Sequence, residues 1–179
     1  MKICVIGYSG AGKSTLAEIL GEKFNLPVLH LDATFWFGDW QQRTRAEQTA
    51  IVKSFMDENP DGWIIDGNYQ KICPERLVSC DRLYFLNYNR FFCFKEAFKR
   101  YKKYKGAVRP DLPCKEKFDF EFARWLLYKG RTVKCKKTFI NNIKNCRGEV
   151  FVFKNRRKLN EYLSKEYGGN NINRTASQG

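Results

Sequence analysis

Apolar and polar positions along the chain follow two alternating patterns. Short apolar runs bounded by turn residues recur five times and predict buried β-strands. The predicted strands span residues 2–6, 28–31, 63–65, 82–86 and 150–153. Longer stretches between them place apolar residues three and four positions apart, which is typical of amphipathic helices. The predicted order, β-α-β-α-β-α-β-α-α-α-β-α, favours an α/β fold with a parallel sheet covered by helices on both faces.

Local signals mark the ends of the first helices. One helix is predicted over 13–24, because Asn25-Leu26-Pro27 follows it and stops it. Another is predicted over 45–58, because Thr44 and Glu47 have the spacing of a capping box.

A long insertion separates the fourth and fifth strands. Three helices are predicted in it, over 90–104, 119–129 and 137–146. A loop containing Gly106, Pro110 and Pro113 is predicted between the first two. After the fifth strand we expect a helix near 155–167 and a disordered polar tail over 168–179.

Length and composition indicate one folded domain. With 179 residues, of which 43% are hydrophobic, the chain is long enough to bury a core, and a single domain over 1–167 is expected. No apolar run approaches the ~20 residues that cross a bilayer. The first apolar run ends at Gly7, so no signal peptide is expected. Seven scattered cysteines without a C-x-x-C pair, and one histidine, favour reduced thiols in a cytoplasmic protein and exclude a zinc pattern.

Positive charge is concentrated in the insertion. Of the net charge of +14, residues 90–137 carry 16 Lys and Arg against 5 Asp and Glu, whereas residues 1–89 carry 9 against 11. Such a run has three possible explanations: a solvent-exposed basic face, an arginine-rich lid over phosphates, or a surface that binds nucleic acid.

The segment from Gly7 to Ser14 fits the phosphate-loop pattern G-x-x-x-x-G-K-[ST], and it lies between a predicted strand and a predicted helix. Its glycines let successive backbone N–H groups point at an anion, and the helix N-terminus adds positive charge. Lys13 would reach the β- and γ-phosphates, and the Ser14 hydroxyl would hold Mg²⁺. The motif therefore predicts binding of a nucleoside triphosphate. The residues expected to bind it are Gly7, Ser9, Gly10, Ala11, Gly12, Lys13, Ser14 and Thr15.

Two aspartates follow predicted strands, at the edge where a parallel sheet binds its ligands. Asp32 would orient an acceptor hydroxyl or take its proton, and the alternative is a solvated loop residue or helix cap. Asp66 resembles a Walker B acid that holds Mg²⁺ through water, and the alternative is a turn residue in Asp66-Gly67. His30 is expected to be a packed, hydrogen-bonded side chain.

Aromatic and cationic residues supply further candidates. The aromatic cluster within 35–40 predicts packing in a connector, with a stacking surface for a substrate ring as the alternative. Arg156 could stack on adenine, whereas Asn155 before it could merely cap a helix.

Phosphoryl transfer needs cations around the phosphoryl group that is transferred, and at least two arginines of the insertion are expected to bind phosphate. The insertion contains Arg90, Arg100, Arg109, Arg124 and Arg131, and Arg100, Arg109 and Arg124 are the catalytic candidates beside Lys13, Asp32 and Asp66.

Several motifs together resemble the bacterial adenylate-kinase-related proteins of the DNA topology modulation (FlaR-like) family, over about residues 1–165. They are Gly7 to Leu16, His30-Leu31-Asp32 with Phe35-Trp36, Trp63 to Tyr69, Arg109-Pro110-Asp111-Leu112-Pro113 and Phe122-Ala123-Arg124-Trp125. The resemblance implies a P-loop kinase fold, a three-layer sandwich with a five-stranded parallel sheet in the order 2-3-1-4-5 and a lid between strands 4 and 5. It also implies ATP and Mg²⁺. Asn87 departs from the aspartate that relatives often carry there.

Two functions of different classes follow. The first is a small ATP-dependent phosphotransferase that acts on a small-molecule acceptor. Because the insertion is basic, this acceptor is expected to be anionic. The second is an ATP-binding, DNA-associated protein that uses the basic segment on phosphates, although the sequence has no helix-turn-helix, zinc or β-ribbon signature. A nucleotide-gated partner module with slow or absent turnover is a third hypothesis.

Overall fold

The fold is described from a computed structural model, for residues 1–38, 40–69, 71–109 and 111–168. Of the tail predicted to be disordered, residues 169–179 lie outside the described residues.

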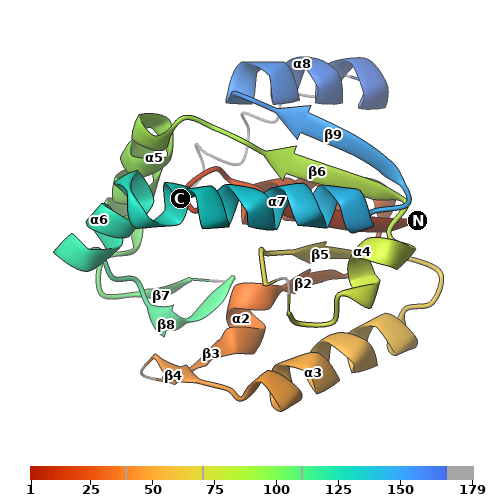
Figure 1. Ribbon diagram of the computed structural model, residues 1–179, viewed down its shortest axis with the longest axis horizontal. Helices are drawn as coiled ribbons and strands as arrows, with labels where there is room; N and C mark the ends of the chain where they lie inside the picture. Colours follow the sequence, from red (N-terminus) through yellow and green to blue (C-terminus); the bar gives the residue numbers. More distant parts are fainter. Residues whose placement is uncertain (39, 70, 110, 169–179) are drawn as a thin grey trace.

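A five-stranded parallel sheet forms the centre of the molecule (Figure 1). Its strands are β1 (Lys2–Gly7), β2 (Val28–His30), β5 (Trp63–Asp66), β6 (Arg82–Leu86) and β9 (Glu149–Phe153). They lie in the order β2-β5-β1-β6-β9, which is the predicted order 2-3-1-4-5. All four neighbouring pairs are parallel. Both the α/β class and the strand order are therefore confirmed.

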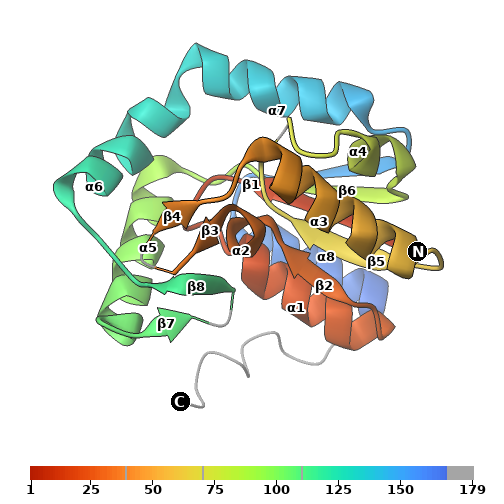
Figure 2. The same cartoon turned by 90° about the horizontal axis from the view of Figure 1, so that it is seen from below.

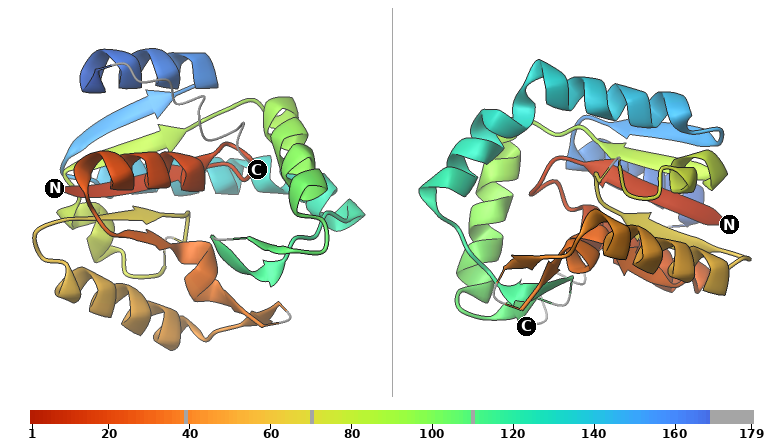
Figure 3. Two further views of the ribbon diagram at one scale, coloured as in Figure 1. Left: turned by 180° about the vertical axis from the view of Figure 1, so that it is seen from behind. Right: turned by 60° about the horizontal axis from the view of Figure 1, so that its bottom comes forward.

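The sheet is sandwiched between two layers of helices. The helices α1 (Lys13–Phe24) and α8 (Arg156–Tyr167) cover one face, and α4 (Glu75–Ser79) and α7 (Val133–Asn145) cover the other (Figures 2 and 3). Because both faces are covered, the central strands are apolar almost without interruption, and Ile3, Val5 and Ile6 have no exposed surface.

Two helices of the first half have the predicted bounds. Helix α1 begins at Lys13 and ends at Phe24, and α3 spans Arg45–Glu58. The capping box predicted for α3 is present, with the Thr44 hydroxyl accepting from the Glu47 N–H and the Glu47 carboxylate accepting from the Thr44 N–H.

The region after β2 differs from the prediction. The strand ends at His30 because the chain turns there into a short helix, α2 (Leu31–Phe35), in which the Thr34 hydroxyl donates to the Leu31 carbonyl at 2.9 Å. Asp32 therefore lies on a helical turn and does not share a strand face with His30. The aromatic connector continues as a hairpin of β3 (Trp36–Phe37) and β4 (Gln41–Gln42).

The first part of the insertion between β6 and β9 lies at the carboxyl ends of the strands, whereas its last helix, α7, runs along one face of the sheet (Figure 1). Helix α5 (Arg90–Tyr104) has its predicted bounds. The predicted loop contains instead a short antiparallel hairpin, β7 (Val108–Arg109) with β8 (Leu112–Lys115). Helix α6 spans Phe120–Leu127 and is followed by a 3-10 turn, η1 (Lys129–Arg131).

Helix α7 starts one turn before the predicted position. Thr132 caps it, because its hydroxyl accepts a hydrogen bond from the Cys135 N–H at 3.3 Å.

None of the helices among the described residues is both long enough and apolar enough to cross a membrane.

Candidate functional site

The phosphate loop connects β1 to α1 at the carboxyl edge of the sheet. Gly10 and Gly12 have φ of 78° and 89°, the left-handed region that glycine adopts without strain. A Cβ at Gly10 would lie 2.2 Å from the Cys93 carbonyl oxygen. The loop therefore packs directly against the backbone of α5, at the start of the insertion.

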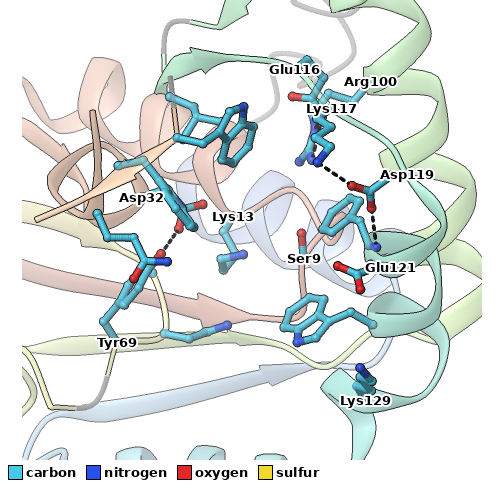
Figure 4. A pocket seen from close by; sticks show the side chains of 18 residues that line it. Ser9, Lys13, Asp32, Tyr69, Arg100, Glu116, Lys117, Asp119, Glu121 and Lys129 are labelled. Atoms are coloured by element: carbon cyan, nitrogen blue, oxygen red, sulfur yellow. Dashed lines mark hydrogen bonds and ion pairs between the residues drawn. The ribbon is translucent and has the colours of Figure 1, made fainter. Parts of the chain in front are cut away.

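The two ends of the loop are held by side chains from β5 and its following turn. Asn68 accepts from the Gly7 N–H at 3.0 Å and donates to the Gly7 carbonyl at 2.7 Å. Lys13, at the first position of α1, lies with its Nζ 3.4 Å from the Tyr8 carbonyl oxygen and points into the adjoining cavity (Figure 4). The loop is thus pinned in place while its lysine remains at the cavity.

Asp66 and Ser14 meet beside the loop. The Ser14 hydroxyl donates to Asp66 Oδ2 at 3.1 Å, and Asp66 is only 4% exposed. The other carboxylate oxygen contacts His30 Nδ1, and His30 Nε2 lies 2.6 Å from Glu18 Oε1. Burial lowers the pKa of His30, but the hydrogen bond and charge of Asp66 and the bond to Glu18 outweigh it and raise the pKa to about 9. His30 is hydrogen-bonded as predicted, but the sequence did not indicate that its partner would be Asp66.

The pair of oxygens from Ser14 and Asp66 fits a Mg²⁺ ion that shares its coordination with phosphates. Mg²⁺ prefers oxygen donors and is held in such sites by one or two protein groups plus the substrate's phosphates. Within the described residues no cluster of three or more His, Cys, Asp and Glu could hold a metal alone. A divalent cation at Ser14 and Asp66 would therefore depend on the phosphates for its remaining ligands.

Asp32 lies across the cavity from α6 (Figure 4). The Tyr69 hydroxyl donates to Asp32 Oδ1 at 2.9 Å. Burial, together with the charge of and hydrogen bond to Asp32, raises the pKa of Tyr69, so the phenol remains a neutral donor. The carboxylate of Asp32 is thereby oriented from one side.

A cavity of about 1060 Å³ extends from the phosphate loop to the insertion. Its first wall contains Ser9 and Lys13 from the loop region, and Asp32 and Tyr69. The opposite wall comes from α5, β8, α6 and the residues between them, with Asp119 and Glu121 directed toward the first wall (Figure 4). The insertion thus closes one side of a space that begins at the phosphate loop.

The predicted arginines occupy different environments. Arg100 lines the cavity and forms an ion pair with Glu116 at 3.2 Å. Arg124 is exposed on α6 and is not among the described residues that line the cavity. Arg109 belongs to β7, and its side chain lies outside the description.

Arg156 lies beside the loop and is not among the described residues that line the cavity. A Cβ at Gly12 would be 3.8 Å from the Arg156 guanidinium, which stands 5.1 Å from the Phe92 ring centroid and pairs with Glu96 at 3.1 Å. Asn155 also caps α8, since its side chain accepts from the Lys158 N–H at 2.9 Å. The two interpretations of this segment are compatible.

Arg131 stands out from the other insertion arginines. Its guanidinium lies 3.4 Å from the ring centroid of Tyr8, a phosphate-loop residue, and donates to the Tyr88 carbonyl at 2.7 Å. Its second terminal nitrogen, Nη2, is buried and has no hydrogen-bond partner among the described residues. No sequence signal separated Arg131 from its neighbours, because its contacts join residues far apart in the chain.

The comparisons with known proteins identify the fold of the chain but not its family. No protein-family model and no curated protein matches the chain. Deoxyadenosine kinase from M. mycoides with bound dATP has a TM-score of 0.53 at 13% identity, over 94% of this chain and 100% of that one. The same enzyme with bound dCTP has a TM-score of 0.51 at 13% identity, over 93% and 98%. Shikimate kinase from Acinetobacter baumannii in complex with shikimate has a TM-score of 0.52 at 14% identity, over 92% and 94%.

At such low identity the similarity concerns the fold. Together with the strand order and the position of the phosphate loop, it shows that the chain has the α/β fold of the P-loop kinases.

Proposed function

We propose that the protein is a kinase that transfers the γ-phosphoryl group of ATP to a hydroxyl of a small acceptor. One observation carries the proposal: a phosphate loop, with Ser14 bonded to the buried Asp66 at 3.1 Å, opens into a cavity whose far wall belongs to the insertion. Phosphoryl transfer needs this combination of anion binding and a water-poor space for the acceptor.

The chain's own groups supply the phosphate site. The N–H groups around Gly10 and Gly12 and the positive end of α1 would bind the phosphates, and Lys13 would reach the γ-phosphate. Ser14 and Asp66 would hold Mg²⁺, which supplies charge neutralisation when bound.

Asp32 is proposed to orient the acceptor hydroxyl and to take its proton as the new bond forms. Tyr69 is a positioning residue, because it acts on Asp32 through their 2.9 Å hydrogen bond. Arg131 is proposed to contact the phosphates, since its Nη2 is a buried donor without a partner among the described residues and lies beside the loop. Arg100 faces the acceptor side.

The adenine base is assigned to the side of the loop opposite the cavity. The Arg156 guanidinium is proposed to stack on the base, with Phe92 beneath it. Arg109 and Arg124 remain catalytic candidates on the basis of the sequence alone.

The decisive experiment compares two lysines of α1. Lys13→Ala should weaken magnesium-dependent ATP binding in calorimetry by about tenfold or more, because a charge-assisted hydrogen bond to phosphate is lost. Lys23→Ala, in the exposed last turn of the same helix, should bind ATP like the wild type. Equal ATP affinity of Lys13→Ala and the wild type would overturn the proposal.

A further inference from the structure

Aromatic side chains line both walls of the acceptor cavity. Trp36, Trp40 and Tyr69 come from the first wall, and Phe122 and Trp125 come from α6 on the opposite wall. Trp36 and Trp40 meet edge to face with their centroids 5.2 Å apart, whereas Phe122 and Trp125 are stacked at 6.2 Å with an interplanar angle of 9°.

These rings are not fully used in packing. Trp40 is 37% exposed and Trp125 is 41% exposed. Large aromatic surfaces left open on both sides of a cavity are typical of a binding site for another planar group.

The charges in the cavity balance one another. The described residues that line it include four cations, Lys13, Arg100, Lys117 and Lys129, and four carboxylates, Asp32, Glu116, Asp119 and Glu121. Arg100 pairs with Glu116 at 3.2 Å, and Lys117 pairs with Asp119 at 2.8 Å. A phosphate or carboxylate on the acceptor would have to compete with these ion pairs. Among the described residues, the cations of the insertion that line the cavity are therefore matched by carboxylates of the insertion, which favours an uncharged acceptor over the anionic one expected from the sequence.

We infer that the acceptor is an uncharged molecule with a planar ring and a hydroxyl group, whose ring lies between the aromatic residues of the two walls. The inference rests on the proposed kinase activity. In the reaction, the acceptor oxygen forms a bond to the γ-phosphorus while the bond from that phosphorus to the β,γ-bridging oxygen breaks. ADP leaves with that electron pair, and the hydroxyl proton passes to Asp32.

The tryptophans provide a direct readout. Three of the four, Trp36, Trp40 and Trp125, line the cavity, and the fourth, Trp63, is fully buried. Intrinsic fluorescence would be titrated with five uncharged ring probes: adenosine, guanosine, cytidine, thymidine and pyridoxine. Three further compounds serve as controls. Ribose lacks the planar aromatic ring, AMP adds a phosphate to adenosine, and shikimate carries a carboxylate on a non-aromatic ring.

At least one ring probe should change the fluorescence in a saturable manner and increase ADP formation from ATP. Ribose, AMP and shikimate should each bind at least tenfold more weakly than that probe. Tightest binding by AMP, ribose or shikimate, or no binding by any ring probe to protein that binds ATP, would overturn the inference.

Two variants of α6 separate stacking from a general effect on the helix. Trp125→Leu should weaken binding of the responsive ring probe at least tenfold in calorimetry, with unchanged ATP affinity. Phe120→Leu, at a position that is 81% exposed and outside the cavity lining, should have no effect on either. Equal probe binding by Trp125→Leu and the wild type would contradict the inference.

The outcome also distinguishes this inference from the proposed function. Saturable ring binding without ADP formation would support ring recognition and contradict phosphotransfer. ADP formation that responds only to ribose or shikimate would support phosphotransfer and contradict ring recognition. A response to AMP alone would support phosphotransfer and contradict an uncharged acceptor.

Discussion

The Ser14 hydroxyl and the Asp66 carboxylate, 52 residues apart in the sequence, lie 3.1 Å apart at the start of α1. Asp66 is held on its other side by His30, which in turn contacts Glu18 at 2.6 Å. The carboxylate is therefore buried and oriented from two directions before any ligand binds.

Asp66→Asn should remove most of the magnesium dependence of ATP binding. The amide keeps the shape of the side chain but loses the charge that attracts a divalent cation. We expect magnesium to strengthen ATP binding about tenfold less in the variant than in the wild type, as seen when groups that support a metal are changed. Calorimetry with and without Mg²⁺ checks this. Asp57→Asn, on the exposed side of α3, is the control, and an unaltered magnesium effect in Asp66→Asn would contradict the assignment.

Gly10→Ala should damage both stability and ATP binding. Two causes act together there, a positive φ of 78° and a backbone oxygen 2.2 Å from the added Cβ. Gly106 has nearly the same φ, 76°, but no atom within 4 Å of an added Cβ. Urea unfolding should show a loss of about 1 kcal/mol for Gly106→Ala and about 3 kcal/mol for Gly10→Ala. Similar losses in the two variants would mean that α5 does not press against the loop.

How far the sequence predicted this structure depends on the length of each signal. The strands and the long helices were predictable, because buried parallel strands and amphipathic helices leave repeated apolar positions. The hairpins formed by β3 with β4 and by β7 with β8 were not, since their short strands contain polar positions such as Gln41 and Gln42 and lack the apolar run that marks the buried strands. The phosphate loop was identified by its local motif. The contacts of Arg131 with Tyr8 and of Asp32 with Tyr69 join distant parts of the chain, so no local pattern contains them.

Arg156→Ala should weaken binding of ATP but not of inorganic triphosphate. If the guanidinium stacks on the base, its loss costs about 1 kcal/mol or more, which is at least about fivefold in affinity. Calorimetry with both ligands checks this. Arg157→Ala is a matched control, because Arg157 is exposed and pairs with Glu161 on the next turn. An equal loss for ATP and triphosphate would instead place Arg156 on the phosphates.

Glu96 gives a prediction for the acid range. Burial raises the pKa of Glu96, but its hydrogen bonds and ion pairs with Lys99 and Arg156 outweigh burial and place the pKa below the usual 4.5. The folded state therefore favours the ionised carboxylate. This contribution is fully present above about pH 4.5 and is lost as the pH falls through the lowered pKa.

Glu96→Gln should accordingly be less stable than the wild type at pH 6, by about 1 kcal/mol or less, and this difference should shrink as the pH falls toward 3. Urea unfolding at the two pH values checks this. Glu161→Gln, whose pair with Arg157 is exposed, should match the wild type at both. A difference for Glu96→Gln that grows toward low pH would have the wrong sign for this account.

Asp32 and Tyr69 should differ in which kinetic constant they affect. Asp32→Asn removes the group that takes the acceptor proton, so acceptor-dependent ADP formation should fall at least a hundredfold in kcat, the range of general-base catalysis. ATP affinity should be nearly unchanged, because Asp32 is assigned to the acceptor and not to the phosphates. Tyr69→Phe removes only the hydroxyl that orients Asp32, and it should lower kcat about tenfold with a smaller change in KM for the acceptor. Phe35, whose ring lies 5.1 Å from that of Tyr69, would keep its neighbour in this variant. If Tyr69→Phe raised KM alone, Tyr69 would be a binding residue for the acceptor, and Asp32 would be oriented by other contacts.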